Sequence, residues 1–310
     1  MKDSLIKKLI FVAPAWLCCS GIFSGALAGE VLPRQILIHD GANRTYVVRM
    51  PIAVGKNKKR VPLVMVLHGG GGNAEVTERM TGFSAKAENE GFIVVYPEGS
   101  SRFKDKLLTW NAGHCCGYAM GHRVDDVGFI GALIDRLIRD YPVDPRRVYV
   151  TGMSNGGMMS HRLGIELSSK LAAIAPVVGT LFGDEQSPAH PVSAIMINGM
   201  LDKSVPHEGG PAGGRFAGAW DGTPTQPALA QAEFWARANR CSPDPVQEQR
   251  GPLMSWHYRC AGGRAVELHL LKDTGHAWPG GLRGSSLGDA PGTTLNATDV
   301  IWNFFRNRSR

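Results

Sequence analysis

The chain of 310 residues is long enough for one large α/β domain or two small ones. Hydrophobic residues make up 43% and charged residues 20% of the chain, a balance that excludes the disordered and fibrous classes. The formal net charge is +7 at pH 7, but aromatic residues do not interleave with the one basic run, residues 56–60. We therefore expect no nucleic-acid partner.

The N-terminus has the order of a secretory signal peptide. A basic start, an apolar run and a small-residue cleavage site follow one another at Lys2–Lys8, Leu9–Leu17 and Ala26–Ala28. An uncleaved membrane anchor is the alternative, which proline and glycine within the stretch disfavour. We predict a signal peptide at 1–28, a mature domain at 29–310, and a secreted or periplasmic protein without membrane contact after cleavage.

Beyond the leader, strand patterns alternate with helix patterns. Residues 35–39 and 45–50 alternate in polarity like an antiparallel edge, whereas 63–67 is the continuous apolar run of a strand buried on both faces. Further strands are predicted at 92–96, 148–151, 172–177, 194–198 and 266–271, and helices at 75–90, 124–140, 155–167, 228–239 and 298–306. Residues 98–122 and 203–227 are predicted loops. This order predicts a single α/β domain, with a mostly parallel central sheet, helices on both faces and an antiparallel N-terminal edge.

Four cysteines follow the leader: Cys115, Cys116, Cys241 and Cys260. An even number in an exported protein indicates disulfides, and three pairings are possible. We favour Cys241–Cys260 with a vicinal Cys115–Cys116 bridge, the alternative for the vicinal pair being two buried, reduced thiols. No second Cys or His cluster lies at ligand spacing, so we expect no metal site.

Gly152-Met153-Ser154-Asn155-Gly156 matches the pattern G-x-S-x-G. Short matches arise by chance, and a glycine-rich turn without chemistry is the alternative. The context favours a nucleophile, because an apolar strand precedes the motif and a helical segment follows it. A nucleophile elbow requires that strand-to-helix turn.

A nucleophilic serine needs a base and an orienting acid, which follow it in the order acid, then histidine. Asp202 ends the turn after the apolar strand 194–198, and His276 lies in the turn after strand 266–271. We therefore predict Ser154, Asp202 and His276 as the catalytic residues. The weaker candidates are Glu208, Asp221 and Asp244 as the acid, and His207, His257 and His269 as the base.

An oxyanion hole needs two backbone N–H groups. We expect one from Asn155, which follows the nucleophile, and the other from Gly70 or Gly71 in the glycine-rich loop after strand 63–67. His68 is expected to shape that loop. A phosphate-binding loop is excluded, because no Gly-Lys-Ser/Thr follows the glycines.

Six ordered segments carry a family resemblance: VLHGGGGN, WNAGHCCGYA, VDDVGFI, VTGMSNGGMM, AAIAPVVG and GHAWPGG. Together they resemble bacterial esterases of the poly(3-hydroxybutyrate) depolymerase and feruloyl esterase group, from about residue 35 to 305. The resemblance implies one α/β-hydrolase domain that cleaves carboxylic esters without a cofactor. It places the nucleophile, acid and base on Ser154, Asp202 and His276. The turn before the acid reads Gly199-Met200-Leu201-Asp202, where similar proteins commonly have Gly-Thr-x-Asp.

The resemblance also implies an acyl pocket lined by Trp110, Cys115 and Cys116, and we add Trp278 to that pocket. The expected substrate is an aromatic acyl ester, as in a feruloyl or acyl-polysaccharide esterase, or a hydroxyalkanoate oligomer or polymer, as in a depolymerase. Two alternatives from other classes remain, an acyltransferase and a catalytically inactive binding protein.

Overall fold

The computed structural model describes residues 30–31, 33–57, 59–214 and 217–310. The signal peptide predicted at 1–28 lies outside the described residues. Within the part of the chain that is described, no helix has the length and apolar character needed to cross a membrane.

The described residues form one eleven-stranded sheet, in the order β1-β3-β5-β4-β6-β7-β8-β11-β10-β9, with β2 paired to β3. Neighbours from β5 through β11 run parallel, whereas both edges are antiparallel. The strands are β1 (Glu30–Val31), β2 (Gln35–His39), β3 (Ala42–Met50), β4 (Val61–Leu67), β5 (Ile93–Pro97), β6 (Val143–Met153), β7 (Ala173–Val177), β8 (Ser193–Gly199), β9 (Val246–Arg250), β10 (Leu253–Arg259) and β11 (Ala265–Leu271).

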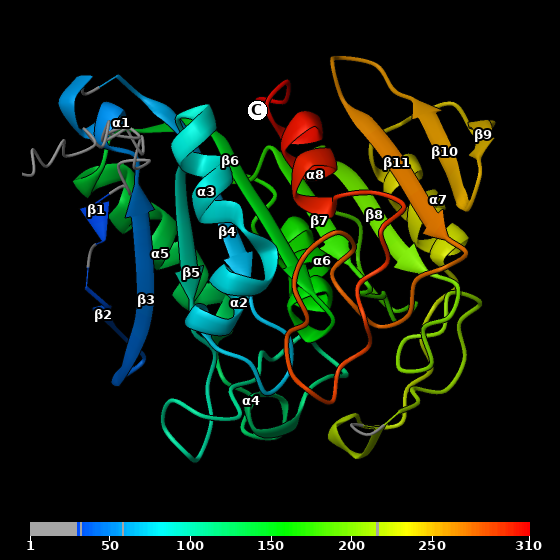
Figure 1. Cartoon of the computed structure of the whole chain (residues 1–310), viewed down its shortest axis with the longest axis horizontal. Coiled ribbons are helices and arrows are strands. Elements are labelled where there is room, and N and C mark those ends of the chain that lie inside the picture. Colours follow the sequence, from blue (N-terminus) through cyan, green and yellow to red (C-terminus); the bar gives the residue numbers. More distant parts are fainter. Residues whose placement is uncertain (1–29, 32, 58, 215–216) are drawn as a thin grey trace, which may run out of the picture.

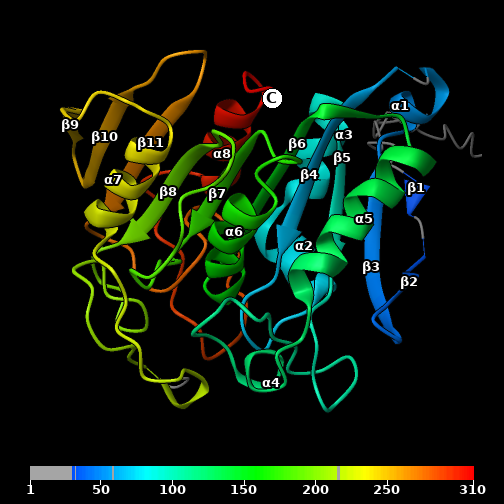
Figure 2. The ribbon, with the colours of Figure 1, turned by 180° about the vertical axis from the view of Figure 1, so that it is seen from behind.

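Helices cover both faces of this sheet. Helices α2, α3 and α8 lie on the face toward the viewer in Figure 1, and α5, α6 and α7 lie on the face shown in Figure 2. Each face buries its own apolar cluster, around Phe83, Phe92 and Trp302 on the first and around Phe129 and Trp235 on the second. The helices are α1 (Ile52–Asn57), α2 (Ala74–Thr81), α3 (Phe83–Glu90), α4 (Gly117–Gly121), α5 (Asp126–Asp140), α6 (Asn155–Glu166), α7 (Ala228–Ala238) and α8 (Ala297–Phe305), with a 3₁₀ turn, η1 (Ala217–Ala219).

The predicted fold class is confirmed. The short helix α1 was not predicted, α4 lies in a segment predicted as a loop, and two larger differences remain. The helix expected at 75–90 is two helices, because Gly82 adopts the left-handed conformation (φ 67°) and its N–H closes α2 on the carbonyl of Glu78. The hairpin of β9 and β10 adds an antiparallel C-terminal edge that was not predicted. Every residue of β9 is exposed, so its sequence has no apolar alternation to identify it.

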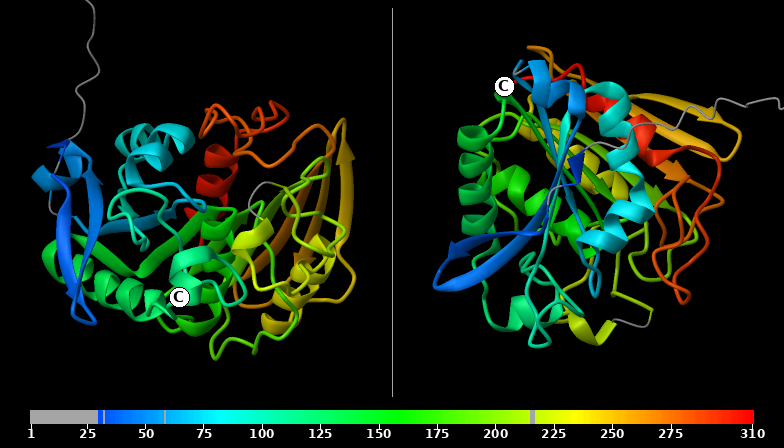
Figure 3. Two further views of the ribbon diagram at one scale, coloured as in Figure 1. Left: turned by 90° about the horizontal axis from the view of Figure 1, so that it is seen from below. Right: turned by 60° about the vertical axis from the view of Figure 1, so that its left-hand side comes forward.

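The parallel strands end at one edge of the sheet, the lower edge in Figure 1. The loop around α4, the loop after β8 and the loop between β11 and α8 gather there, and the left panel of Figure 3 views the molecule from that side. In open α/β sheets, ligands bind outside the carboxyl ends of the strands. This edge is where the predicted site residues meet.

Candidate active site

Ser154 lies in the tight turn between β6 and α6. Residues with a Cβ rarely adopt its backbone conformation (φ 57°, ψ −123°). Its N–H donates to the carbonyl of Val177 at 2.9 Å. The two glycines of the motif leave room for the turn. A Cβ on Gly152 would lie 2.6 Å from the carbonyl oxygen of Gly156, and one on Gly156 would lie 2.5 Å from that of His68.

Three predicted residues form a continuous hydrogen-bonded relay. The Oγ of Ser154 lies 2.8 Å from Nε2 of His276, and Nδ1 of His276 lies 2.7 Å from Oδ2 of Asp202. The side chain of Asp202 is 1% exposed and that of His276 is 20% exposed. The acid is therefore shielded from water, while the imidazole borders an open space.

Sheet order explains why Asp202 and His276 meet. Strands β8 and β11 are parallel neighbours, with Gly199 opposite Leu271 at their ends, so the two following turns lie side by side. The N–H of Leu201 donates to the carbonyl of Thr274 at 3.0 Å.

The acid turn itself is held by hydrogen bonds. Oδ1 of Asp202 accepts the backbone N–H groups of Ser204 and Val205 at 2.8 and 2.9 Å. The turn is thus fixed by backbone groups, although it lacks the threonine common in similar proteins.

A second carboxylate supports the histidine. Oδ2 of Asp289 accepts the backbone N–H of His276 at 2.7 Å, and a Cβ on Gly275 would lie 2.3 Å from the same oxygen. Asp289 was not predicted, because it lies 13 residues beyond His276 in an irregular loop with no motif to indicate it.

The backbone N–H groups of Gly70 and Asn155 have no acceptor among the described residues, and both residues line the same cavity as Ser154. Asn155 is the first residue of α6, whose free N-terminal N–H groups and dipole favour negative charge. The N–H of Gly71 donates to the carbonyl of Leu108 at 2.8 Å. The prediction of Gly71 as a donor is therefore wrong, and Gly70 is the remaining candidate from this loop.

The side chain of Asn155 ties the start of α6 to the loop after β5. Its Oδ1 accepts the N–H of Trp110 at 2.7 Å, and its Nδ2 donates to the carbonyl of Trp110 at 3.0 Å. The indole Nε1 of Trp110 donates to the carbonyl of His68 at 3.0 Å. Trp110 is buried and joins Asn155 to the backbone of His68, which begins the glycine-rich loop after β4.

His68 is a neutral, structural residue. Its Nε2 accepts the N–H of Gly99 at 2.9 Å, so the ring proton resides on Nδ1, 2.8 Å from the carbonyl of Gly69. Complete burial lowers the pKa of His68 to about 4. The expectation that His68 shapes the loop agrees with this geometry.

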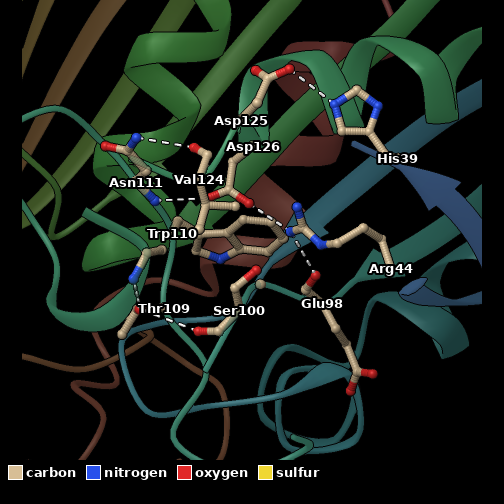
Figure 4. A network of polar contacts seen from close by, with 12 residues as sticks. His39, Arg44, Glu98, Ser100, Thr109, Trp110, Asn111, Val124, Asp125 and Asp126 are labelled. Carbon is tan, nitrogen blue, oxygen red and sulfur yellow. Dashed lines mark hydrogen bonds and ion pairs between the residues drawn. The ribbon is translucent and has the colours of Figure 1, made fainter. Parts of the chain in front are cut away.

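A buried polar network supports the same loop (Figure 4). The guanidinium of Arg44 donates to Oδ1 of Asp126 at 2.6 Å and to the carbonyl of Glu98 at 3.2 Å. Oδ2 of Asp126 accepts the N–H of Asn111 at 2.7 Å, next to Trp110. Burial raises the pKa of Asp126, with the charge of Arg44 opposing the shift. The network thus links β3 and α5 to the loop that holds Asn155.

A cavity of about 630 Å³ opens in front of Ser154, Asn155 and His276. Its walls come from the loops after β5 and β8 and are largely apolar or aromatic, with contributions from Phe103, Leu107, Cys116, Tyr118, Val205 and Trp220. Of these, only Cys116 was predicted. The others lie in loops without periodicity, so no pattern in the sequence indicated which side chains turn inward.

Three pocket predictions need correction. Trp110 and Cys115 are fully buried and do not line the cavity. The Sγ of Cys115 lies 3.8 Å from Nδ2 of Asn155. Trp278 packs edge-on against Phe83 and donates to Oγ1 of Thr298, which places it in the core under α3 and α8.

The preferred disulfide pairing, Cys115–Cys116 and Cys241–Cys260, is confirmed.

Three of the weaker candidates for acid and base, Asp221, His257 and His269, have other partners. Asp221 binds His114, His269 lies 2.8 Å from Oγ of Ser255, and His257 pairs with Glu267. The relay therefore contains the predicted first choices for both roles.

His114 joins three loops next to Trp220, which lines the cavity. Its Nδ1 lies 2.7 Å from Asp221 and its Nε2 lies 2.9 Å from Asp184, while the backbone of Cys115 pairs with that of Trp220. Burial lowers the pKa of His114, but hydrogen bonds to both carboxylates outweigh this and raise it above its ordinary value. The pKa of Asp221 is lowered, chiefly by a hydrogen bond from the backbone N–H of Thr223 and further by the hydrogen bond to His114.

Replacing His114 by alanine is expected to lower Tm by roughly 2 °C at pH 6. The variant loses the two partly exposed ion pairs with Asp184 and Asp221, which together contribute about 1 kcal/mol to the free energy of unfolding. Because the pKa of His114 is raised in the folded state, its contribution to stability is complete at pH values below the unfolded-state pKa of about 6.5. This contribution is lost as the pH rises through the folded-state pKa. At pH 9 the variant should match the wild type within error. Thermal unfolding at both pH values tests this, with the exposed His190→Ala as control. An equal loss at both pH values would contradict it.

Comparison with known proteins points to one family. The family described as "Esterase PHB depolymerase" matches residues 45–206, a segment that includes Ser154 and Asp202 and ends before His276. Feruloyl esterase B of Piromyces equi is 30% identical over 248 residues, covering 78% of this chain and 44% of that protein. The putative esterase NocK of Nocardia uniformis is 32% identical over 234 residues, covering 71% of this chain and 66% of that protein. The chain thus spans less than two thirds of either relative.

Among solved structures, an acetyl xylan esterase from Aspergillus awamori superposes with a TM-score of 0.60 at 14% identity. The likeness covers 89% of this chain and 99% of that one. At this identity the likeness concerns the fold, which is that of the α/β-hydrolases.

Proposed function

The chain belongs to the esterase PHB depolymerase family, and from this premise we propose that it hydrolyses carboxylic esters through an acyl-enzyme formed on Ser154. The observation that carries the proposal is the relay from Ser154 through His276 to Asp202, with contacts of 2.8 and 2.7 Å. A serine in this setting has a base within reach of its proton and an acid that orients the base.

In the proposed mechanism, Nε2 of His276 takes the hydroxyl proton as Oγ of Ser154 attacks the ester carbonyl carbon. Asp202 holds the Nδ1–H tautomer and stabilises the imidazolium that forms. His276 then returns the proton to the leaving alcohol. A water molecule, deprotonated by His276, then attacks the acyl carbon. The bond to Oγ of Ser154 breaks, His276 returns the proton to Oγ, and the acid is released.

The negative oxygen of each tetrahedral intermediate is stabilised by the N–H groups of Gly70 and Asn155. Such donors act because they are oriented before the charge develops, and each contributes about 3–4 kcal/mol. The bonds between Asn155 and Trp110 support this role, because they fix where the N–H of Asn155 points.

We propose that the acyl group is aromatic and esterified to plant polysaccharide. The aromatic lining of the cavity from Phe103, Tyr118 and Trp220 supports a flat, apolar acyl group, as does the similarity to a feruloyl esterase. Two disulfides, which persist in oxidising compartments, support action outside the cytoplasm.

Hydrolysis of methyl ferulate, measured beside a soluble 3-hydroxybutyrate trimer, tests this assignment. We expect kcat/KM to be at least tenfold higher for methyl ferulate, because the trimer has no ring to fill the aromatic cavity. The same assay on medium, periplasmic and cytoplasmic fractions of a host carrying the full chain is expected to find the activity outside the cytoplasm.

The other outcomes are equally informative. A preference for the trimer would assign the protein to polyester or oligomer degradation. Acyl transfer to an added sugar that exceeds hydrolysis would make it an acyltransferase. If neither ester, nor a generic short-chain ester, were hydrolysed, the esterase proposal would be wrong and a binding protein would remain.

A further inference from the structure

A second hollow, of about 580 Å³, lies beside the first cavity. His276 and Ser204 line both spaces, so the catalytic imidazole stands between them. The hollow is formed by the turn after β8 and by the loop between β11 and α8. The two oxyanion residues, Gly70 and Asn155, line only the first cavity.

We propose that this hollow binds the alcohol half of the ester and accepts a neutral polyol, namely a sugar residue. This inference rests on the proposed ester hydrolysis. His276 protonates the leaving alcohol, so that oxygen must lie beside the imidazole when the carbonyl oxygen occupies the oxyanion hole. The acyl group is then directed into the first cavity, and the alcohol leaves toward the far side of His276.

The lining of the hollow suits a sugar. Lys203 and Ser285 supply hydrogen-bond donors, and the carboxylates of Asp273 and Asp289 supply acceptors. Oδ2 of Asp289 accepts the N–H of His276, but an ionised carboxylate has about four acceptor positions, so most remain for sugar hydroxyls. Two carboxylates against one ammonium also disfavour an anionic alcohol.

Apolar contacts complete the lining. Leu201 and Leu287 are 58% and 71% exposed at the hollow, where they can cover the C–H face of a sugar ring. Such exposed leucines are removed from water when the alcohol binds, which adds affinity without restricting which hydroxyl carries the acyl group.

The outer wall of the hollow is held in place by the rest of the fold. The N–H of Leu282 donates to the carbonyl of Met80 in α2 at 2.9 Å, and the N–H of Gly280 donates to that of Gly292 at 2.8 Å. Asp289 then fastens this loop to the backbone of His276. The subsite and the base are therefore parts of one hydrogen-bonded unit.

Two esters with the same acyl group test the proposal, methyl ferulate and a feruloylated arabinose oligosaccharide. In the double variant Lys203→Met, Ser285→Ala, the ratio of kcat/KM for the sugar ester to that for the methyl ester is expected to fall at least about thirtyfold, mainly through KM. That is the size expected for losing one charged and one neutral hydrogen bond. Both residues are exposed, and thermal unfolding of the variant checks that it is folded.

Phe103→Ala in the first cavity is the matched control, because it removes contact with the acyl group that both esters share. It is expected to lower kcat/KM for both esters together and leave the ratio unchanged. An unchanged ratio in the double variant, or a fall in the ratio with Phe103→Ala instead, would overturn the assignment of the two sides while leaving ester hydrolysis intact. Absence of Ser154-dependent hydrolysis of either ester would instead remove the proposed function itself.

Discussion

Replacing Ser154 by alanine is expected to lower kcat/KM for methyl ferulate by about 10⁴- to 10⁶-fold. The change removes the only atom that forms the acyl-enzyme bond, and His276 then has no hydroxyl to deprotonate. Alanine keeps the Cβ that the strained backbone at φ 57° already accommodates, so Tm should change little. Steady-state kinetics with purified protein, together with thermal unfolding, measures both effects.

A matched control and a double variant sharpen this prediction. Ser187→Ala replaces an exposed serine in another loop and should leave kcat/KM within twofold of the wild type. Adding His276→Ala to Ser154→Ala should reduce the rate little further, because the relay acts as a unit. Residual activity of Ser154→Ala within tenfold of the wild type would show that another group is the nucleophile.

Replacing Arg44 by methionine is expected to lower the free energy of unfolding by about 3–5 kcal/mol. The guanidinium is 5% exposed and its partner Asp126 is fully buried, so the variant leaves an uncompensated charge in the core. Asp126→Leu should cost a similar amount, because it strands Arg44 in the same way. Urea unfolding followed by tryptophan fluorescence provides the values.

The double variant Arg44→Met, Asp126→Leu should be less destabilised than the sum of the two single variants, because neither charge is then left alone. The exposed i,i+4 pair Arg237–Glu233, at 3.8 Å, is the control. Arg237→Met should cost below about 1 kcal/mol. Equal costs at the buried and exposed pairs would mean that the network in Figure 4 contributes no more than a surface contact.

The predicted strands and helices were mostly correct because their apolar residues repeat with a regular period. The continuous apolar runs of β4, β7 and β8 follow from burial on both faces of the sheet. The prediction failed where the apolar residues do not repeat with a regular period. Strand β9 is exposed along its whole length, and the break at Gly82 depends on one left-handed residue.

The same distinction applies to the candidate site. Ser154, Asp202 and His276 could be predicted because each follows a recognisable strand, and parallel strands place their following turns at one edge. The failures concern groups in irregular loops. Gly71 is adjacent to Gly70, but only the fold directs its N–H to Leu108, and Trp278 turns into the core two residues after His276.

By itself, the sequence determined the order of strands and helices, the motif that holds Ser154 and the turns that carry its two partners. These features are local, because they depend on residues within a few positions of one another. Only the tertiary structure decided which N–H groups stay free, that His276 stands between two hollows, and that Asp289 and the Arg44–Asp126 pair support the site. Those relations join residues from 13 to more than 80 positions apart, and no local pattern encodes a contact that forms only when the chain has folded.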